Sequence, residues 1–101
     1  MGRLRSGLFR VGRMRLAIVP DTVPSVLNET TREFGERVRQ RRLKLGLSQE
    51  AAAVRCGIHW TQLGKVERGQ RSLRLETIVK IGRGLEIDAG SLVSGLPIPP
   101  S

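Results

Sequence analysis

The sequence predicts an all-α protein, a compact bundle of five short helices preceded by a basic N-terminal extension. Apolar residues recur at helical spacing between residues 30 and 95, and capping residues or glycines stand at most of the expected helix ends. The 101 residues suffice for one domain with a modest core. We therefore expect a flexible basic arm over 1–29, a helical domain over 30–95 and a short proline-rich tail over 96–101.

The first helix is expected to run from Thr30 to about Leu45. Thr30 and Glu33 have the spacing of a capping box, in which each side chain bonds the backbone of the other residue. Glycine is common directly after a helix, so Gly46 marks the end. The apolar residues of the face expected to be buried are Phe34, Val38 and Leu45.

The second and third helices are expected over 49–55 and 60–68. Ser48 is placed to cap the second helix, Gly57 to make the turn between the two helices, and Gly69 to end the third. A small side chain, Ala52 or Ala53, is expected where the two helices cross. The residues expected to seal the third helix onto the core are Ile58, Leu63 and Val66.

The last two helices are less strongly marked. A fourth is expected near residues 75–85, where Leu75, Ile78, Val79, Ile81 and Leu85 recur at helical spacing. Asp88 is placed to cap a short fifth helix through Val93.

The charge predicts a polyanionic partner. The chain holds 18 Lys and Arg against 9 Asp and Glu, a net charge of +9, and residues 30–95 alone carry +6. This excess favours nucleic acid first and an acidic membrane surface second. Arginine suits phosphate and guanine contacts, although its excess over lysine is also explained by a GC-rich genome.

Several classes of function are disfavoured. Cys56 and His59 are the only cysteine and the only histidine, so neither an intrachain disulfide nor a structural zinc site is expected. No apolar run approaches the length of about 20 residues that spans a bilayer. With no paired carboxylates in a credible pocket and no phosphate-loop glycines, we expect no enzyme and no cofactor. A cytoplasmic protein, associated with the nucleoid through DNA, is the default.

The second and third helices together form a helix-turn-helix pattern. Two short helices joined by a tight turn that contains glycine are typical of this motif. Because the inner face of the third helix packs on the core, its outer face is free to enter the major groove of DNA.

Four segments resemble the Cro/C1-type (XRE) repressors. They are Phe34-Gly-Glu-Arg-Val38, Leu47-Ser-Gln-Glu50, Cys56-Gly-Ile58 and Val66-Glu-Arg-Gly69, and the resemblance covers about residues 32–95. It implies the fold of the lambda repressor and a sequence-specific regulator that binds duplex DNA at an operator, usually as a homodimer.

The same resemblance implies roles for individual residues. Trp60, Thr61 and Lys65 fall at positions that face base edges. Arg42 and Glu67 match a partly buried ion pair between the first helix and the end of the third. The positions implied to contact phosphate or to support the recognition helix are Ser48, Gln49, Gln62, Arg68 and Arg71.

The sequence departs from the family pattern in ways that predict weak points. His59 stands where serine or threonine usually caps the third helix, so this helix start is expected to be weak. Gly64 interrupts the recognition helix at a cost of about 1 kcal/mol relative to alanine. Gly82 and Gly84 replace typical alanines, and Glu86 replaces the usual terminal glycine, which puts the stability of the fourth helix in doubt.

Alternatives remain open for residues and for function. Trp60 either touches a base or sugar or is half-buried against the second helix, and Lys65 either reads guanine or grips phosphate. The arm over 1–29 either wraps around DNA or is a disordered segment that makes no contact with DNA. The same domain serves antitoxins, which would also bind a protein partner, and restriction-modification controllers. An interaction module that has lost DNA binding is a further alternative, which the charge disfavours.

Overall fold

The structure, a computed structural model, describes residues 26–99 and contains five helices and no strand in that range. The helices are α1 (Glu29–Lys44), α2 (Gln49–Cys56), α3 (Trp60–Glu67), α4 (Leu75–Gly84) and α5 (Ala89–Val93). The all-α prediction is therefore confirmed. The predicted basic arm lies outside the described residues, except for residues 26–29.

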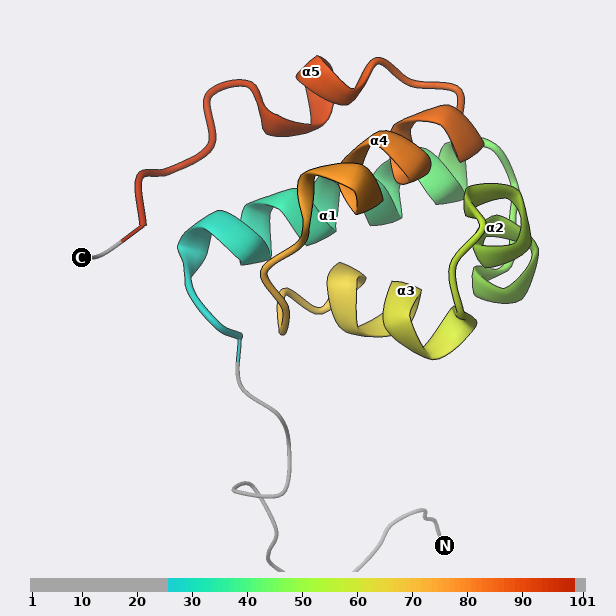
Figure 1. Ribbon diagram of the computed structural model, residues 1–101, viewed down its shortest axis with the longest axis horizontal. Coiled ribbons are helices and arrows are strands. Elements are labelled where there is room, and N and C mark those ends of the chain that lie inside the picture. The colour runs from blue at the N-terminus through green and yellow to red at the C-terminus, as the bar shows by residue number, and fades with distance from the viewer. Residues whose placement is uncertain (1–25, 100–101) are drawn as a thin grey trace, which may run out of the picture.

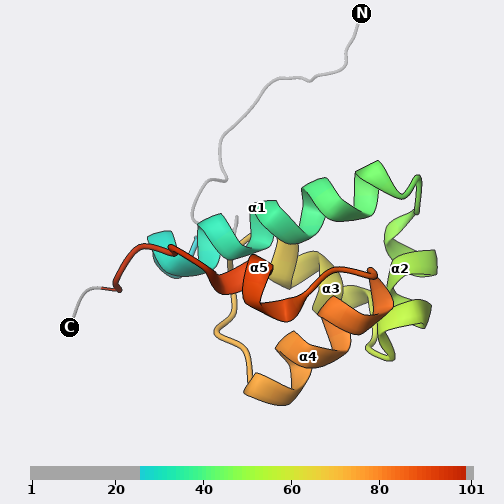
Figure 2. The ribbon, with the colours of Figure 1, turned by 90° about the horizontal axis from the view of Figure 1, so that it is seen from above.

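The helices surround one small core. α3 contacts α1 and α2, α2 also contacts α4, and α5 contacts both α1 and α4. Figure 1 shows α3 and α5 on opposite sides of the α1–α4 pair, and Figure 2 shows α2 beside the end of α1. Every helix contributes to the core, and its buried apolar side chains are Phe34, Val38, Ala52, Ala53, Cys56, Leu63, Val66, Ile81, Leu85 at the C-cap of α4, and Leu92. Burying a leucine or valine side chain contributes about 1.5–3 kcal/mol, which makes this core the main source of stability.

The start of α1 differs from the prediction. The N-cap is Asn28, whose Oδ1 accepts from the Thr31 amide at 2.9 Å, while the Thr31 hydroxyl accepts from the Asn28 amide at 3.2 Å. The capping box is therefore Asn28 with Thr31, and the prediction of Thr30 with Glu33 was wrong. The Thr30 hydroxyl instead donates to the Pro97 carbonyl at 2.7 Å, which fastens the tail to α1.

The helix-turn-helix region closely follows the prediction. Ser48 caps α2 by accepting from the Ala51 amide at 3.0 Å, and α2 ends at Cys56, one residue later than expected. Gly57 has φ +71, and Gly69 after α3 has φ +73, so both turns need the left-handed backbone that glycine adopts without strain. α3 ends at Glu67, one residue earlier than expected, with Arg68 as its C-cap.

Two predicted N-caps turned out differently. The Thr61 amide donates to His59 Nδ1 at 3.2 Å, so an imidazole nitrogen takes the place of the usual hydroxyl and caps α3, where a weak helix start was expected. Asp88 stands at the N-cap of α5 as expected, but its side chain makes no capping hydrogen bond.

The glycines of α4 permit close packing. A Cβ at Gly84 would lie 2.6 Å from the Cα of Cys56, and a Cβ at Gly82 would lie 2.9 Å from the carbonyl oxygen of Ile87. Real Cβ atoms do not approach backbone this closely, so alanine at either position would push α4 away from its neighbours. The departure from the family's alanines therefore lets α4 approach α2 and the segment that leads to α5.

Glu86 is a strained position that can be tested directly. It is the only described non-glycine residue with positive φ, at 56°, a conformation that costs a side-chain-bearing residue about 1–2 kcal/mol. Glu86→Gly should raise the free energy of unfolding by about 1 kcal/mol, as measured by urea denaturation. Glu86→Gln is the control, because it removes the exposed ion pair with Arg55 and keeps the strain. Equal destabilisation by both variants would contradict the strain.

Candidate nucleic-acid interface

α3 presents a clear inner and outer face. Leu63 and Val66 are buried in the core, while Trp60 and Thr61 are exposed and Lys65 is half-buried. Gly64 is covered by two side chains rather than by backbone, since its Cβ would lie 3.1 Å from an Arg68 guanidinium nitrogen. The side of α3 away from the core is therefore open at its first turn and partly covered by side chains in its second turn.

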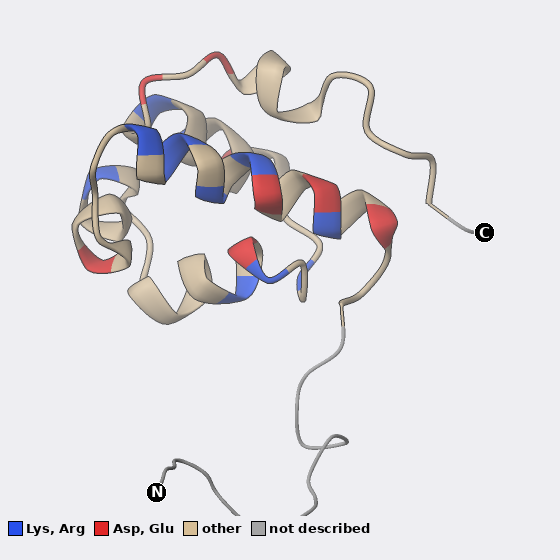
Figure 3. Cartoon of the chain, turned by 180° about the vertical axis from the view of Figure 1, so that it is seen from behind, with Lys and Arg blue, Asp and Glu red and all other residues tan. Residues whose placement is uncertain are grey.

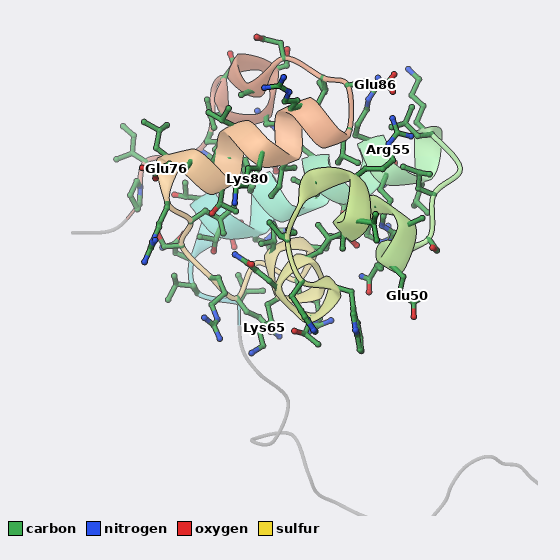
Figure 4. All side chains as sticks on the ribbon, turned by 45° about the vertical axis from the view of Figure 1, so that its right-hand side comes forward. Glu50, Arg55, Lys65, Glu76, Lys80 and Glu86 are labelled. Carbon is green, nitrogen blue, oxygen red and sulfur yellow. The ribbon has the colours of Figure 1, made fainter. Side chains whose placement is uncertain are left out.

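A groove of about 680 Å³ runs between α3 and α4. One wall holds Thr61, Gln62 and Lys65 of α3, and the other holds Thr77 and Lys80 of α4. The turn between α2 and α3 and the loop before α4 complete the lining with Gly57, Ile58, His59, Arg71, Ser72, Leu73 and Arg74. No lining residue carries a carboxylate. Figure 4 labels Lys65 on α3 and Lys80 on α4, the helices that form the two walls.

The three predicted base-facing residues separate into two groups. Thr61 and Lys65 line the groove together, whereas Trp60 lies outside its lining. The Trp60 ring stacks on His59 with 6.0 Å between ring centroids and remains 50% exposed. The ring contact of Trp60 is thus with the residue before α3, and Trp60 is one of the exposed large apolar residues. The Thr61 hydroxyl lies 2.8 Å from His59 Nδ1, which ties the start of α3 to the same ring.

Arg42 and Glu67 form a buried ion pair with two hydrogen bonds between the guanidinium and the carboxylate. Arg42 Nε donates to Glu67 Oε2 at 2.6 Å and Arg42 Nη2 donates to Oε1 at 2.9 Å. The two side chains are 11% and 2% exposed. The hydrogen bond from Glu67 raises the pKa of the Arg42 guanidinium against the desolvation that burial imposes. This pair joins α1 to the end of α3.

Gln49 extends this pair into α2. Its Nε2 donates to Glu67 Oε1 at 3.0 Å, and Arg42 Nη1 donates to the Leu47 carbonyl at 2.9 Å. The cluster thus connects α1, the start of α2 and α3, and holds the recognition helix at a fixed angle. The resemblance implies that Gln49 supports the recognition helix, and this role stays a prediction beside the observed contact with Glu67.

The other predicted phosphate-side residues lie at different places. The exposed Ser48 hydroxyl accepts the capping bond of α2. Gln62 and Arg71 line the groove, and the exposed Arg68 lies over Gly64. The structure therefore brings Gln62 and Arg71 together with Thr61 and Lys65, and places Ser48 and Arg68 beyond the groove lining.

Several of the arginines of α1 bond other parts of the protein. Arg37 donates to the carbonyl of Ser94 after α5 at 2.6 Å, and Arg41 donates to the carbonyls of Leu85 and Glu86 after α4 at 2.8 Å. Carbonyls at helix ends lack intrahelical donors, so these guanidinium groups act as caps. The guanidinium groups of Arg37, Arg41 and Arg42 therefore stabilise contacts between helices.

Among the lining residues that the sequence analysis did not assign to the interface are three at or in α4, Arg74, Thr77 and Lys80. They recur at intervals of three, so the helical pattern of α4 places them on neighbouring parts of one face. The signal was present, but it becomes informative only when α4 is known to face α3 across a groove. Figure 3 shows acidic and basic segments alternating in the first half of α1, basic segments without acidic ones in its second half, and mostly basic segments at the end of α3 and in the loop after it.

Two further observations bear on function. Cys56 is buried, and burial raises the pKa of its thiol, which disfavours the reactive thiolate. Among the described residues, the longest apolar stretches fall short of the helix length that a bilayer requires.

Comparison with known proteins places the chain in a family. A model of the helix-turn-helix family matches residues 38–92. The control protein C.BamHI of Bacillus amyloliquefaciens is 41% identical over 61 residues, which cover 59% of this chain and 75% of that protein. The crystal structure of the restriction-modification controller C.AhdI from Aeromonas hydrophila has a TM-score of 0.60 and 40% identity, over 61% of this chain and 94% of the other.

A solved repressor–DNA complex is also similar. The P22 c2 repressor in complex with a synthetic operator has a TM-score of 0.57 and 27% identity, over 61% of this chain and 94% of that chain. The family match covers more than half of the chain, and its span contains both helices of the motif and the groove beside them. The chain therefore belongs to the Cro/C1-type (XRE) helix-turn-helix family of DNA-binding transcriptional regulators.

Proposed function

We propose that the protein binds a duplex operator with α3 in the major groove. The observation that supports this proposal best is the groove beside α3, which holds basic side chains and no carboxylate, together with the exposed first turn of α3. Thr61 and Lys65 share the groove side of this face, so in this proposal they make the deepest base contacts. Trp60 lies outside the groove and contacts sugar or a thymine methyl at its edge.

The Lys65 side chain offers a direct test of base reading. Lys65→Ala should weaken operator binding by about 1–3 kcal/mol and relax the choice of base at one position. The measurement is the dissociation constant for the operator, first obtained by selection from random duplexes, and for its single-base variants. Lys44→Ala is a matched control, because Lys44 lies in the lining of a separate groove between α1 and α5. Equal weakening on every sequence would reassign Lys65 to phosphate binding and contradict base reading.

A two-fold homodimer is part of the proposal. Val93 of α5 and Ile98 of the tail are exposed, as are Leu75 and Val79 of α4. Apolar side chains of this size commonly mark association surfaces when they gather on one face. A dimer would bind two half-sites about one helical turn apart, so the selected operator should be palindromic. An operator without two-fold symmetry would contradict this assembly.

Similarity to two control proteins favours one biological role. The 41% identity to C.BamHI and the 40% identity to C.AhdI support a controller of restriction-modification genes. Genome-wide capture of DNA with the purified protein tests this role. The expected result is a site upstream of restriction or methyltransferase genes, and sites confined to unrelated genes would reject it.

A further inference from the structure

We infer that α4 is a second DNA-contacting wall, in which Arg74 and Lys80 bind backbone phosphates of the strand beside the recognition helix. This inference rests on the proposed function and extends it to a helix outside the helix-turn-helix motif. It assigns Arg74 and Lys80 to affinity, and it leaves the choice of sequence to α3.

The first observation in support is that the described Lys and Arg side chains divide into those with a protein partner and those without one. Arg32, Arg39 and Arg55 have carboxylate partners, and the α1 arginines at 37, 41 and 42 bond carbonyls or Glu67. The described cations whose side chains make no hydrogen bond or ion pair are Lys44, Lys65, Arg68, Arg71, Arg74, Lys80 and Arg83. Four of these, Lys65, Arg71, Arg74 and Lys80, line the single groove between α3 and α4.

The second support is the absence of compensating charge in that groove. None of its lining residues is Asp or Glu, so the four cations repel one another without local neutralisation. A phosphate chain relieves this repulsion and releases its own counterions, which makes it the partner that such a groove favours.

The third support is the direction of the groove. Its lining includes the loop before α4 at Arg71 and Arg74, and also the turn before α3 at Gly57 and His59. Between these limits it follows the side of α3 that carries Thr61 and Lys65. If α3 enters the major groove, the strand that borders it on this side lies between the two helices.

The α4 cations are spaced to bind separately. Arg74 is the N-cap of α4 and makes no side-chain capping bond, and Lys80 is six residues later, about 9 Å along the axis. Each side chain therefore has its own length of groove. Phosphate contacts made in this way fix the position of a protein on DNA and carry no sequence information directly.

The test is the salt dependence of duplex binding by the full chain. Dissociation constants are measured between low and moderate salt for the wild type, Arg74→Ala, Lys80→Ala and the double variant. Each single substitution should reduce the log–log slope by about 0.9, and the double variant by about twice that. The loss should be the same factor on the operator and on single-base variants. Lys80→Arg should keep the wild-type slope, and Lys44→Ala should leave it unchanged.

The outcomes separate this inference from the proposed function. Wild-type slopes in both α4 variants would overturn the second wall and leave operator binding by α3 intact. A loss confined to particular bases would also overturn it, because α4 would then read sequence. A wild-type protein without salt-dependent duplex binding would overturn the proposed function together with this inference. Thermal melting of each variant should match the wild type, since neither side chain has a protein partner.

Discussion

Arg42→Met is expected to lower the free energy of unfolding by about 3–5 kcal/mol. The substitution leaves the Glu67 carboxylate, which is 2% exposed, with the Gln49 amide as its remaining side-chain donor. A buried carboxylate without a cation is costly because the protein interior solvates charge poorly. The Leu47 carbonyl also loses its donor. Urea denaturation monitored by circular dichroism measures the change.

A matched control uses an exposed ion pair in the same helix. Arg32 bonds Glu29 at 2.7 Å, but both side chains are more than half exposed. Arg32→Met should therefore leave stability nearly unchanged, because water solvates the freed Glu29 and screens the original pair. Two variants of equal stability would show that the Arg42–Glu67 pair contributes no more than a surface contact.

Gly35→Ala is expected to destabilise the fold by about 3 kcal/mol or more, at the upper end of overpacking effects. An added Cβ would overlap the carbonyl oxygen of Val66 and lie 2.8 Å from that of Glu67. Both neighbours are backbone at the end of α3, so relief requires α1 and α3 to separate. This separation would also strain the Arg42–Glu67 pair, which spans the same two helices.

The same substitution at Gly64 should have the opposite sign. There the Cβ would meet the ends of flexible side chains, Arg68 at 3.1 Å and Gln49 at 3.6 Å, which can shift. Helix propensity then dominates, and Gly64→Ala should stabilise α3 by up to about 1 kcal/mol. Thermal melting of both variants makes the comparison. Destabilisation of similar size at Gly64 and Gly35 would contradict the distinction between side-chain and backbone neighbours.

These two contacts bear on function because both set the position of α3. The Gly35 approach lets α1 lie directly against the end of the recognition helix, and the cluster of Arg42, Glu67 and Gln49 connects that end to α1 and α2. A helix held at both places presents Thr61 and Lys65 at a defined angle. In our proposal, folding thus already orders α3, so little conformational entropy of this helix is lost when the protein binds DNA.

The helices and the motif could be predicted from the sequence, because their signals are local. Apolar spacing, Ser48 as a cap and the positive-φ turns at Gly57 and Gly69 act within a few residues of chain. The same local rules failed at the start of α1. Asn28 and Thr31 there satisfy the same requirement as Thr30 and Glu33, and the sequence does not show which pair prevails.

The division between side chains that bond other parts of the protein and side chains that remain available to a ligand depends on how the helices pack. Composition predicted a polyanionic partner, but it could not show that Arg37 and Arg41 bond helix-end carbonyls while Arg74 and Lys80 line an open groove. It also could not show that Gly84 lies against the backbone of α2. The reason is physical: hydrogen-bond partners, steric clearance and desolvation depend on atoms distant in sequence, and packing of the helices brings those atoms together.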